Sequence, residues 1–416
     1  MTRDHHDRRS RPSFANPPRI AICGEIWSAN LGDAVIAVSL AHLVLRCRPD
    51  ALVTFIDISG RKLPPREQPH ATPGRRMWFG PPVRWWRQLR ELGRSFREWL
   101  SAWPSPEKTY DLTIIGGGQL LMDNDLWFPS RLWLLLHRMA PHTRAFAIHS
   151  CGVGDSWSPI GRWLCSRLLS DAGMVARSVR DPSSRERADR HLRCPSNAIA
   201  VVPDPALWAA EAFQASGHHE TIIVGAGIMS PPAGMQGADP RCTEWLGADF
   251  LLDFWRNVIA MITSRGHVVQ IFTNGDPDDH AFAKRVHEGL SGSLRERTIV
   301  LPRPTQPGDL VRTIASFRAI MAQRLHALII GYSLGVPAVG LVWDDKVRQF
   351  VILTGHPERG LEPGAAPAAA VETLYEAIAA GVDDQRRDEL RAAALAGVRE
   401  MLRSASLPGA SLPGDA

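Results

Sequence analysis

The sequence lacks the cysteine spacing of a disulfide framework or of a zinc site. None of its six cysteines belongs to a Cys-x-x-Cys pair, and several lie inside apolar runs. Free buried thiols are the simplest interpretation, so neither a structural metal nor a disulfide is expected. The six positions are Cys23, Cys47, Cys151, Cys165, Cys194 and Cys242.

The sequence also lacks a secretion signal and a membrane span. Residues 1–18 are polar, basic and proline-containing, without the apolar core that a secretion signal needs. The most apolar stretch, Leu325–Trp343, contains glycines, a proline and His326, which divide it into helix, turn and strand. We therefore predict a cytoplasmic protein. Residues 1–18 and the tail 404–416, which repeats a Ser-Leu-Pro-Gly phrase, are predicted to be disordered.

Charge of neither sign is in large excess. The chain has 48 Lys and Arg against 43 Asp and Glu, a formal net charge of +5. Such a mild excess suits small anionic substrates or a membrane surface and does not indicate a nucleic-acid partner. The 416 residues, 44% of them hydrophobic and 22% charged, exceed the usual size of one hydrophobic core. Two globular domains are therefore expected.

Short strand-like runs alternate with helix-length segments along the chain. Such alternation predicts an α/β protein with parallel sheets that helices cover on both faces. The runs form two series, which predict Rossmann-like domains at 19–208 and 209–403, with the boundary near 206–219. The first series comprises Arg19–Cys23, Leu52–Ile56, Leu112–Ile115, Arg144–Ile148, Met174–Ser178 and Ala198–Val202. The second comprises Thr221–Val224, His267–Phe272, Thr298–Leu301, Ala319–Met321 and Pro337–Leu341.

The first strand is followed by a motif that suits an anion site. After Gly24 and a short loop come Asn30-Leu31-Gly32-Asp33 and an apolar segment of helical length, Ala34–Leu45. Glycine lets the backbone approach a ligand at a helix N-terminus, where unpaired N–H groups favour anions. An ordinary helix N-cap at Asp33 is the alternative interpretation.

Consecutive glycines mark the end of the third predicted strand. Gly116, Gly117 and Gly118 follow Asp111–Ile115, and an open α/β sheet builds its ligand crevice at such carboxyl ends. No Gly-Lys-Ser or Gly-Lys-Thr follows, so this is not a Walker loop. A purely structural tight turn remains the alternative. The segment His149–Gly154 repeats the pattern, again with glycines at a strand end.

Arginines follow strand ends in both halves of the sequence. Arg180 follows the strand Met174–Ser178 and could grip a carboxylate or phosphate with two N–H groups; a surface ion pair with Asp181 is the alternative. Arg324 stands beside His326 at the start of an apolar helix, an arrangement that predicts an anion clamp with an acid/base group. A structural buried histidine is the alternative there. Thr273–Asp279 reads as a turn and helix cap in preference to a metal site.

Several short phrases, taken in order, resemble the polysaccharide pyruvyl transferase family. Each phrase is weak alone, but the ordered set is fairly specific and covers roughly residues 19–355. The phrases are Asn30-Leu31-Gly32-Asp33, Gly116-Gly117-Gly118, Val179-Arg180-Asp181 with Ser184, Asp204-Pro205, Thr273-Asn274-Gly275, Arg324-Leu325-His326, Gly335-Val336-Pro337 and Asp345-Lys346.

The resemblance implies a fold like the two-domain GT-B glycosyltransferases, with the active site between the domains and the donor on the second one. It also implies phosphoenolpyruvate as co-substrate, no further cofactor and no metal, and an acceptor sugar of a cell-surface polysaccharide or its lipid-linked precursor. His326 would be catalytic. The implied substrate-binding residues are Arg180, Arg324, Leu325, Asn30, Gly32, Asp33, Gly116, Gly117, Gly118 and Lys346. A nucleotide-sugar glycosyltransferase and a non-catalytic binding module are the competing interpretations.

The chemistry also suits these residues without the resemblance. Phosphoenolpyruvate carries a carboxylate and a phosphate, which Arg180 and Arg324 could neutralise and orient. Forming a ketal requires protonation of the methylene carbon and attack by sugar hydroxyls, and His326 could serve both proton transfers.

The sequence departs from the family pattern in an insert rich in arginine and tryptophan at residues 59–110. Apolar residues recur at helical spacing within 83–100, and arginines occupy the other faces of the predicted helix. This helix could contact anionic lipid, which would suit a lipid-linked acceptor, or it could pack on the domain or at a dimer contact. The apolar residues are Trp85, Leu89, Leu92, Phe96 and Trp99.

Overall fold

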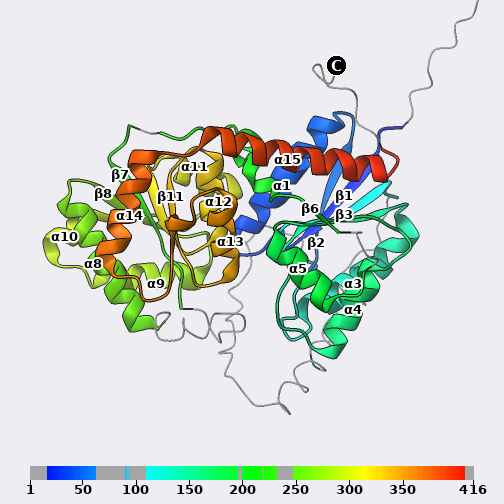
Figure 1. The fold of residues 1–416 in the computed structure, drawn as a ribbon, viewed down its shortest axis with the longest axis horizontal. Helices are drawn as coiled ribbons and strands as arrows, with labels where there is room; N and C mark the ends of the chain where they lie inside the picture. The colour runs from blue at the N-terminus through cyan, green and yellow to red at the C-terminus, as the bar shows by residue number, and fades with distance from the viewer. Residues whose placement is uncertain are drawn as a thin grey trace, which may run out of the picture.

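The computed structural model describes residues 16–61, 90, 93, 109–194, 199–218, 220–231 and 247–407. In these residues the chain forms two six-stranded sheets side by side, with helices packed around each (Figure 1). All strand pairs within both sheets are parallel. The predicted α/β fold with two parallel-sheet domains is confirmed.

The first sheet has the strand order β2-β1-β3-β4-β5-β6. Its strands are β1 (Arg19–Gly24), β2 (Leu52–Asp57), β3 (Leu112–Gly116), β4 (Phe146–Cys151), β5 (Met174–Val179) and β6 (Ala200–Val201). The helices of this part are α1 (Leu31–Cys47), α3 (Trp127–Met139), η2 (Ala140–His142), α4 (Pro159–Leu169), α5 (Pro182–His191), η3 (Pro205–Trp208) and α6 (Ala209–Ala212).

The second sheet has the strand order β12-β11-β10-β7-β8-β9. Its strands are β7 (Ile223–Gly227), β8 (Val268–Phe272), β9 (Thr298–Val300), β10 (Ala319–Ala322), β11 (Ala338–Leu341) and β12 (Gly360–Leu361). The helices are α8 (Ala248–Ser264), α9 (Pro277–Glu288), α10 (Gly292–Glu296), α11 (Pro307–Ala315), α12 (Leu325–Ser333), α13 (Asp345–Leu353), η4 (Pro357–Arg359), α14 (Pro367–Ala380) and α15 (Asp384–Ser404).

The central strands are apolar along their whole length because helices cover both faces of the sheet. In β3, every residue from Leu112 to Gly116 is buried, and in β10 every residue from Ala319 to Ala322 is buried. Helix α1 is also buried on most of its surface, because it lies between the first sheet and the second domain and contacts both α11 and α12. The two domains therefore share a continuous apolar core, to which Leu31 and Leu325 both belong.

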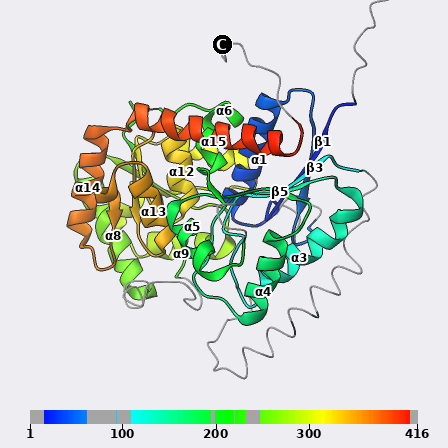
Figure 2. The same cartoon turned by 45° about the vertical axis from the view of Figure 1, so that its right-hand side comes forward.

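Helix α15 ends the described chain on the first domain. It contacts α1, η3, β4 and β5, and in Figures 1 and 2 it runs along one side of the molecule from the second lobe to the first. Thus the last helix of the predicted domain 209–403 packs on the domain 19–208. Ser404 ends this helix and Leu407 is buried in the shared core, whereas residues 408–416 of the predicted tail lie outside the described residues.

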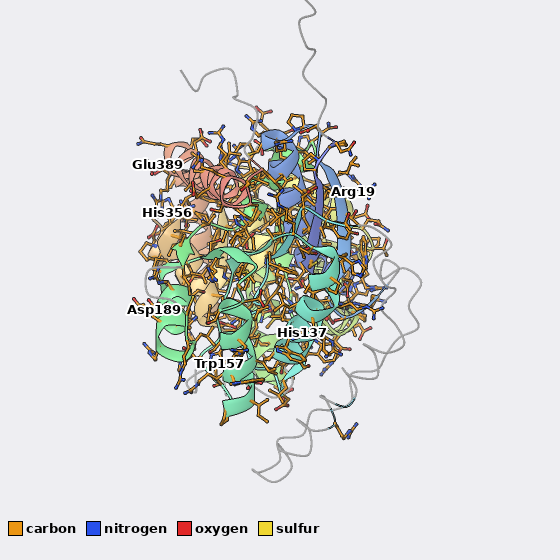
Figure 3. All side chains as sticks on the ribbon, turned by 90° about the vertical axis from the view of Figure 1, so that its right-hand side faces the viewer. Arg19, His137, Trp157, Asp189, His356 and Glu389 are labelled. Atoms are coloured by element: carbon orange, nitrogen blue, oxygen red, sulfur yellow. The ribbon has the colours of Figure 1, made fainter. Side chains whose placement is uncertain are left out.

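Figure 3 looks at the first domain from its outer end. Arg19, at the start of β1, lies near one end of the domain, and Trp157, which follows the carboxyl end of β4, lies near the other. The loops that follow the strands are thus gathered on the side of Trp157. This side includes the sequence motifs proposed for ligand binding.

Two further predictions fall almost entirely outside the part of the chain that the structure describes. The predicted helix at 83–100, apart from Arg90 and Gly93, and the predicted disordered residues 1–15 lie outside the described residues. Among the helices that the structure does describe, none combines the length and the apolar character needed to cross a bilayer.

Candidate active site

The triple glycine forms part of a double loop at the carboxyl ends of β3 and β4. The Gly152 N–H donates to the Gly118 carbonyl at 2.9 Å, and the Leu121 N–H donates to the Gly152 carbonyl at 3.2 Å. Gly117 has a φ of +79°, in the left-handed region that favours glycine, and a Cβ there would lie 2.3 Å from Ile36 of α1. Glycine is therefore required at position 117 for the turn and for packing against α1, so the structural interpretation holds at Gly117.

Gly32 brings helix α1 into contact with the predicted catalytic histidine. A Cβ at Gly32 would lie 2.4 Å from the Nδ1 atom of His326, so only glycine leaves room for the ring. The Leu31 N–H donates to the Asn274 carbonyl at 2.9 Å, and a Cβ at Gly275 would lie 2.7 Å from the Ala29 carbonyl oxygen. Three motifs that are far apart in the sequence, at 30–33, 273–275 and 324–326, therefore meet at the domain junction.

Asp33 lies in the first turn of α1 and is not its N-cap, so the N-cap interpretation is wrong. Asn30 occupies the N-cap position and makes no side-chain capping bond. The Oδ2 atom of Asp33 accepts hydrogen bonds from Ser28 Oγ at 3.2 Å and from Asn30 Nδ2 at 3.3 Å. Burial raises the pKa of Asp33 to about 7, and the nearby Glu25 carboxylate adds to this rise. Asp33 is thus a carboxyl group that titrates near neutrality.

Arg180 is buried at the end of β5 and pairs with its neighbour. Its Nε donates to Asp181 Oδ2 at 3.1 Å, and the other carboxylate oxygen, Oδ1, accepts from the Ser184 N–H at 2.6 Å at the start of α5. Arg180 and Asp181 are only 7% and 5% exposed, so the alternative of a surface ion pair is wrong. A Cβ at Gly152 would lie 2.9 Å from the guanidinium carbon, which explains the glycine there.

Arg324 is held by a carboxylate that the sequence reading missed. Its Nε and Nη2 atoms both lie 2.8 Å from Asp279 Oδ2. Asp279 is fully buried in α9, and its Oδ1 accepts from the Ser230 N–H at 2.9 Å and from Ser230 Oγ at 3.0 Å. Burial raises the pKa of Asp279 and Arg324 opposes the rise. The predicted turn and cap is confirmed at Asp276, which caps α9 by accepting from the Asp278 N–H.

His326 is buried in the first turn of α12 among three cationic side chains. Burial lowers the pKa of His326 to about 3, and the positive charges of Arg180, Lys346 and Arg324 contribute in that order. Its Nε2 atom is buried and has no hydrogen-bond partner among the described residues. The imidazole is therefore neutral at pH 7 and has one ring nitrogen available to a ligand.

Lys346 comes from the start of α13. Its Nζ lies 3.1 Å from Asp344 Oδ2 and 4.5 Å from the centre of the Trp343 ring. The neighbouring Asp345 connects the domains, because it accepts hydrogen bonds from Ser183 Oγ at 3.1 Å and from the Arg187 side chain, both in α5. Burial opposes ionisation of Asp345, but Arg187 lowers its pKa overall. The cation at Lys346 is thus fixed beside a domain-bridging ion pair.

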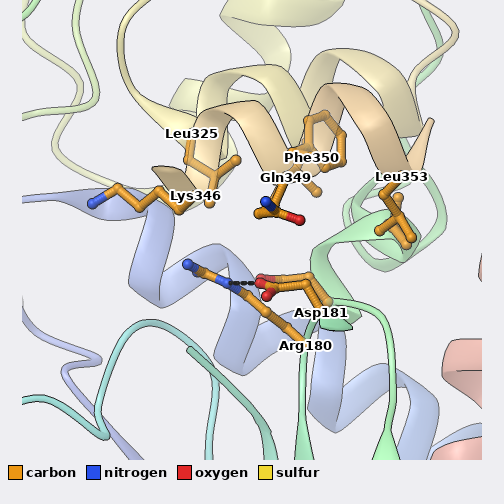
Figure 4. Close-up of a pocket in the computed structure, with 10 residues that line it drawn as sticks. Arg180, Asp181, Leu325, Lys346, Gln349, Phe350 and Leu353 are labelled. Carbon is orange, nitrogen blue, oxygen red and sulfur yellow. Dashed lines mark hydrogen bonds and ion pairs between the residues drawn. The ribbon is translucent and has the colours of Figure 1, made fainter. Parts of the chain in front are cut away.

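A small pocket lies between the domains at these residues. Three predicted substrate-binding residues, Arg180, Leu325 and Lys346, line it. Figure 4 shows Arg180 and Asp181 on the side of the first domain, facing four side chains of the second: Leu325, Lys346, Gln349 and Phe350. Asp204 also lines the pocket, and its Oδ2 is buried without a hydrogen-bond partner among the described residues.

Other unpaired polar atoms lie in the same motifs. Buried polar atoms are normally hydrogen-bonded, so a group of exceptions marks a place for ligand or water. Among the described residues, buried atoms without a partner include Asn30 Oδ1, Thr273 Oγ1 and Asn274 Nδ2. His149 lies within β4 and not after it; its Nδ1 lies 3.4 Å from Ser178 Oγ, and burial lowers its pKa to about 4. In the described part of the chain, no cluster of acidic, histidine and cysteine side chains suits a metal ion.

Two parallel-sheet domains around a pocket at the strand ends define a GT-B-like fold. The family model for polysaccharide pyruvyl transferases matches residues 30–345, so the chain belongs to this transferase family, and the resemblance seen in the motifs is confirmed. No curated protein matches the sequence.

Solved structures of low sequence identity share the fold. The S. aureus MnaA–UDP structure has a TM-score of 0.52 at 10% identity, with 95% of this chain and 100% of the other covered. A putative UDP-N-acetylglucosamine 2-epimerase from Listeria monocytogenes has a TM-score of 0.52 at 11% identity, with 95% and 100% covered. The Neisseria meningitidis UDP-GlcNAc 2-epimerase has 0.51 at 8% identity, with 93% and 99% covered. Identities this low show the fold alone.

Proposed function

We propose that the protein transfers the pyruvyl group of phosphoenolpyruvate to a sugar of a cell-surface polysaccharide or of its lipid-linked precursor, forming a ketal. The observation that carries this proposal is the meeting of Arg180, Arg324 and Lys346 around His326 at the domain junction. These three cations match a small donor with two acidic groups. Membership of the pyruvyl transferase family supports the same chemistry.

The two arginines are prepared to bind the donor's carboxylate and phosphate. Asp181 holds the Nε of Arg180, and Asp279 holds the Nε and one terminal nitrogen of Arg324. Each guanidinium is thus fixed from one side by a carboxylate, which leaves further N–H groups for an anion. Fixing the guanidinium before the donor arrives reduces the entropy lost on binding.

His326 supplies the proton-transfer group of the second domain. Burial, together with three neighbouring cations, keeps its imidazole neutral, so it can accept the proton of an attacking sugar hydroxyl through Nε2. A bound donor neutralises these cations, which raises the histidine pKa toward its ordinary value. The protonated imidazole could then return its proton, so that one residue serves as both base and acid.

Binding experiments distinguish this function from that of a nucleotide-sugar glycosyltransferase. We expect phosphoenolpyruvate to raise the melting temperature of the protein more than UDP or a UDP-sugar does at the same concentration. We also expect mass spectrometry of candidate glycans incubated with phosphoenolpyruvate to show the added ketal together with released phosphate. Stabilisation by UDP but not by phosphoenolpyruvate would favour the glycosyltransferase.

A further inference from the structure

A second titratable side chain, the carboxyl group of Asp33, lies across the domain junction from His326. Asp33 follows Gly32, and Gly32 is the residue that touches the His326 ring. Arg324 and Lys346 of the second domain are also close enough to Asp33 to act on its charge. The first turn of α1 therefore brings a carboxyl group to the same junction that the histidine and the cations occupy.

The hydrogen bonds of Asp33 leave one of its oxygens available. Ser28 and Asn30 both donate to Oδ2. The other oxygen, Oδ1, lies beside the glycine loop, where a Cβ at Gly118 would be 3.1 Å from it. Because Gly118 has no side chain, Oδ1 is not covered from that direction. The charged groups that act on Asp33 are the Glu25 carboxylate on its own domain and the cations Lys346 and Arg324 opposite.

Three other carboxylates near the junction are already engaged. Asp181 uses its two oxygens for Arg180 and the Ser184 N–H, and Asp279 uses its two for Arg324 and Ser230. Glu25 accepts hydrogen bonds from the side chains of Ser59 and Arg61. The oxygens of these three carboxylates are thus occupied by neighbouring donors, whereas Asp33 keeps Oδ1 available.

From this geometry we infer that Asp33 is the acid that protonates the methylene carbon of phosphoenolpyruvate, while His326 is the base for the attacking hydroxyl. The inference rests on the proposed function and divides between two residues the work that one histidine would otherwise do. The environments of the two groups push their pKa values apart, to about 7 for Asp33 and about 3 for His326. Such a separation is the usual mark of an acid and base pair.

The cycle balances with these two groups alone. Asp33 gives its proton to C3, the first sugar oxygen bonds to C2, and His326 takes the proton of that hydroxyl. The bond from C2 to the phosphate oxygen then breaks, and protonated His326 gives its proton to the leaving phosphate. The second hydroxyl oxygen bonds to C2, and its proton returns to Asp33. In each turnover the new methyl group thus receives the proton of Asp33, which the second hydroxyl replaces, and phosphate receives the proton of the first hydroxyl, so both residues regain their starting states.

The test compares Asp33→Asn with Asp33→Glu and Glu25→Gln. Phosphate release from phosphoenolpyruvate is measured against pH with a panel of methyl glycosides of glucose, galactose, mannose and N-acetylglucosamine, and donor binding is followed by melting temperature. We expect Asp33→Asn to lose about 10²- to 10⁴-fold in turnover while phosphoenolpyruvate still stabilises it. Asp33→Glu should recover part of the rate, because it restores an ionisable acid.

The pH profile separates catalysis from a structural role. Turnover should fall as the pH rises through the Asp33 pKa, because the protonated acid is the active form. Glu25→Gln removes a negative charge that raises this pKa, so the fall should move to lower pH. If Asp33→Asn keeps more than about a tenth of the turnover, or Glu25→Gln leaves the profile in place, Asp33 is not the acid. A wild-type protein that neither binds phosphoenolpyruvate nor releases phosphate from it would overturn the proposed function itself.

Discussion

Asp279→Asn removes the charge that holds Arg324 without changing the size of the side chain. The carboxylate is fully buried and contacts two nitrogens of Arg324 at 2.8 Å, whereas the arginine side chain is 25% exposed. Hydrogen bonds to charged groups contribute about 1.5–3 kcal/mol, and each 1.4 kcal/mol is a factor of ten. If the lost contact misplaces Arg324, the affinity for phosphoenolpyruvate should fall by about 10- to 150-fold. Turnover at saturation should change much less, because Arg324 transfers no proton.

The assay is phosphate release at varied donor concentration, with calorimetric binding of phosphoenolpyruvate as a second measurement. Asp276→Asn is the matched control, because Asp276 caps the same helix without touching Arg324. The control should lose at most about 1 kcal/mol of stability and keep the wild-type KM. Combining Asp279→Asn with Arg324→Lys should give less than the sum of the two effects, because the residues form one unit. Unchanged donor affinity in Asp279→Asn, or an equal loss in the control, would refute the positioning role.

Three further predictions concern the arginines, the histidine and the insert. Arg180→Lys and Arg324→Lys should each raise the donor concentration needed for saturation. The fall in kcat/KM should correspond to a transition-state cost of about 2–4 kcal/mol, and wild-type kinetics in both variants would contradict the assignment. His326→Gln should lose about 10²- to 10⁴-fold in turnover, and near-normal turnover would leave His326 only a positioning role. In the wild-type enzyme, kcat should fall on the acid side at a higher pH than kcat/KM does, because the bound donor raises the pKa of His326 above about 3. The protein should bind anionic liposomes through residues 83–100, and salt should weaken this binding. Liposome sedimentation should show that the binding is lost when Trp85, Leu89 and Phe96 are all replaced by Ser.

The sequence predicted the two sheets because buried parallel strands are continuous apolar runs, which are easy to distinguish from the polar loops around them. It placed Arg180, Arg324 and Gly116–Gly118 at strand ends for the same reason. Parallel strands also direct their carboxyl ends to one edge, so these residues were expected to be near a common crevice.

The partners across the junction could not be predicted in this way. Asp279 lies 45 residues before Arg324 in the sequence, and its contact depends on where α9, which packs on β8 and β9, lies relative to the chain that follows β10. The need for Gly32 arises from the His326 ring in the other domain, and the N-cap position of α1 falls at Asn30 and not at Asp33. Local patterns identify the end of each strand, but they do not determine which loops touch when two domains come together.

The path of α15 restricts how the domains can move. The chain passes from the first domain to the second after α6 and returns between α14 and α15, so two separate connections join the same pair of bodies. A body attached to another at two points turns most easily about the line through both points, whereas twisting or sliding strains one of the attachments. The pocket would therefore open to admit a sugar, and close around it, by rotation of one domain about a single hinge axis through the two connections. One angle would then set the distance between the two walls of the pocket.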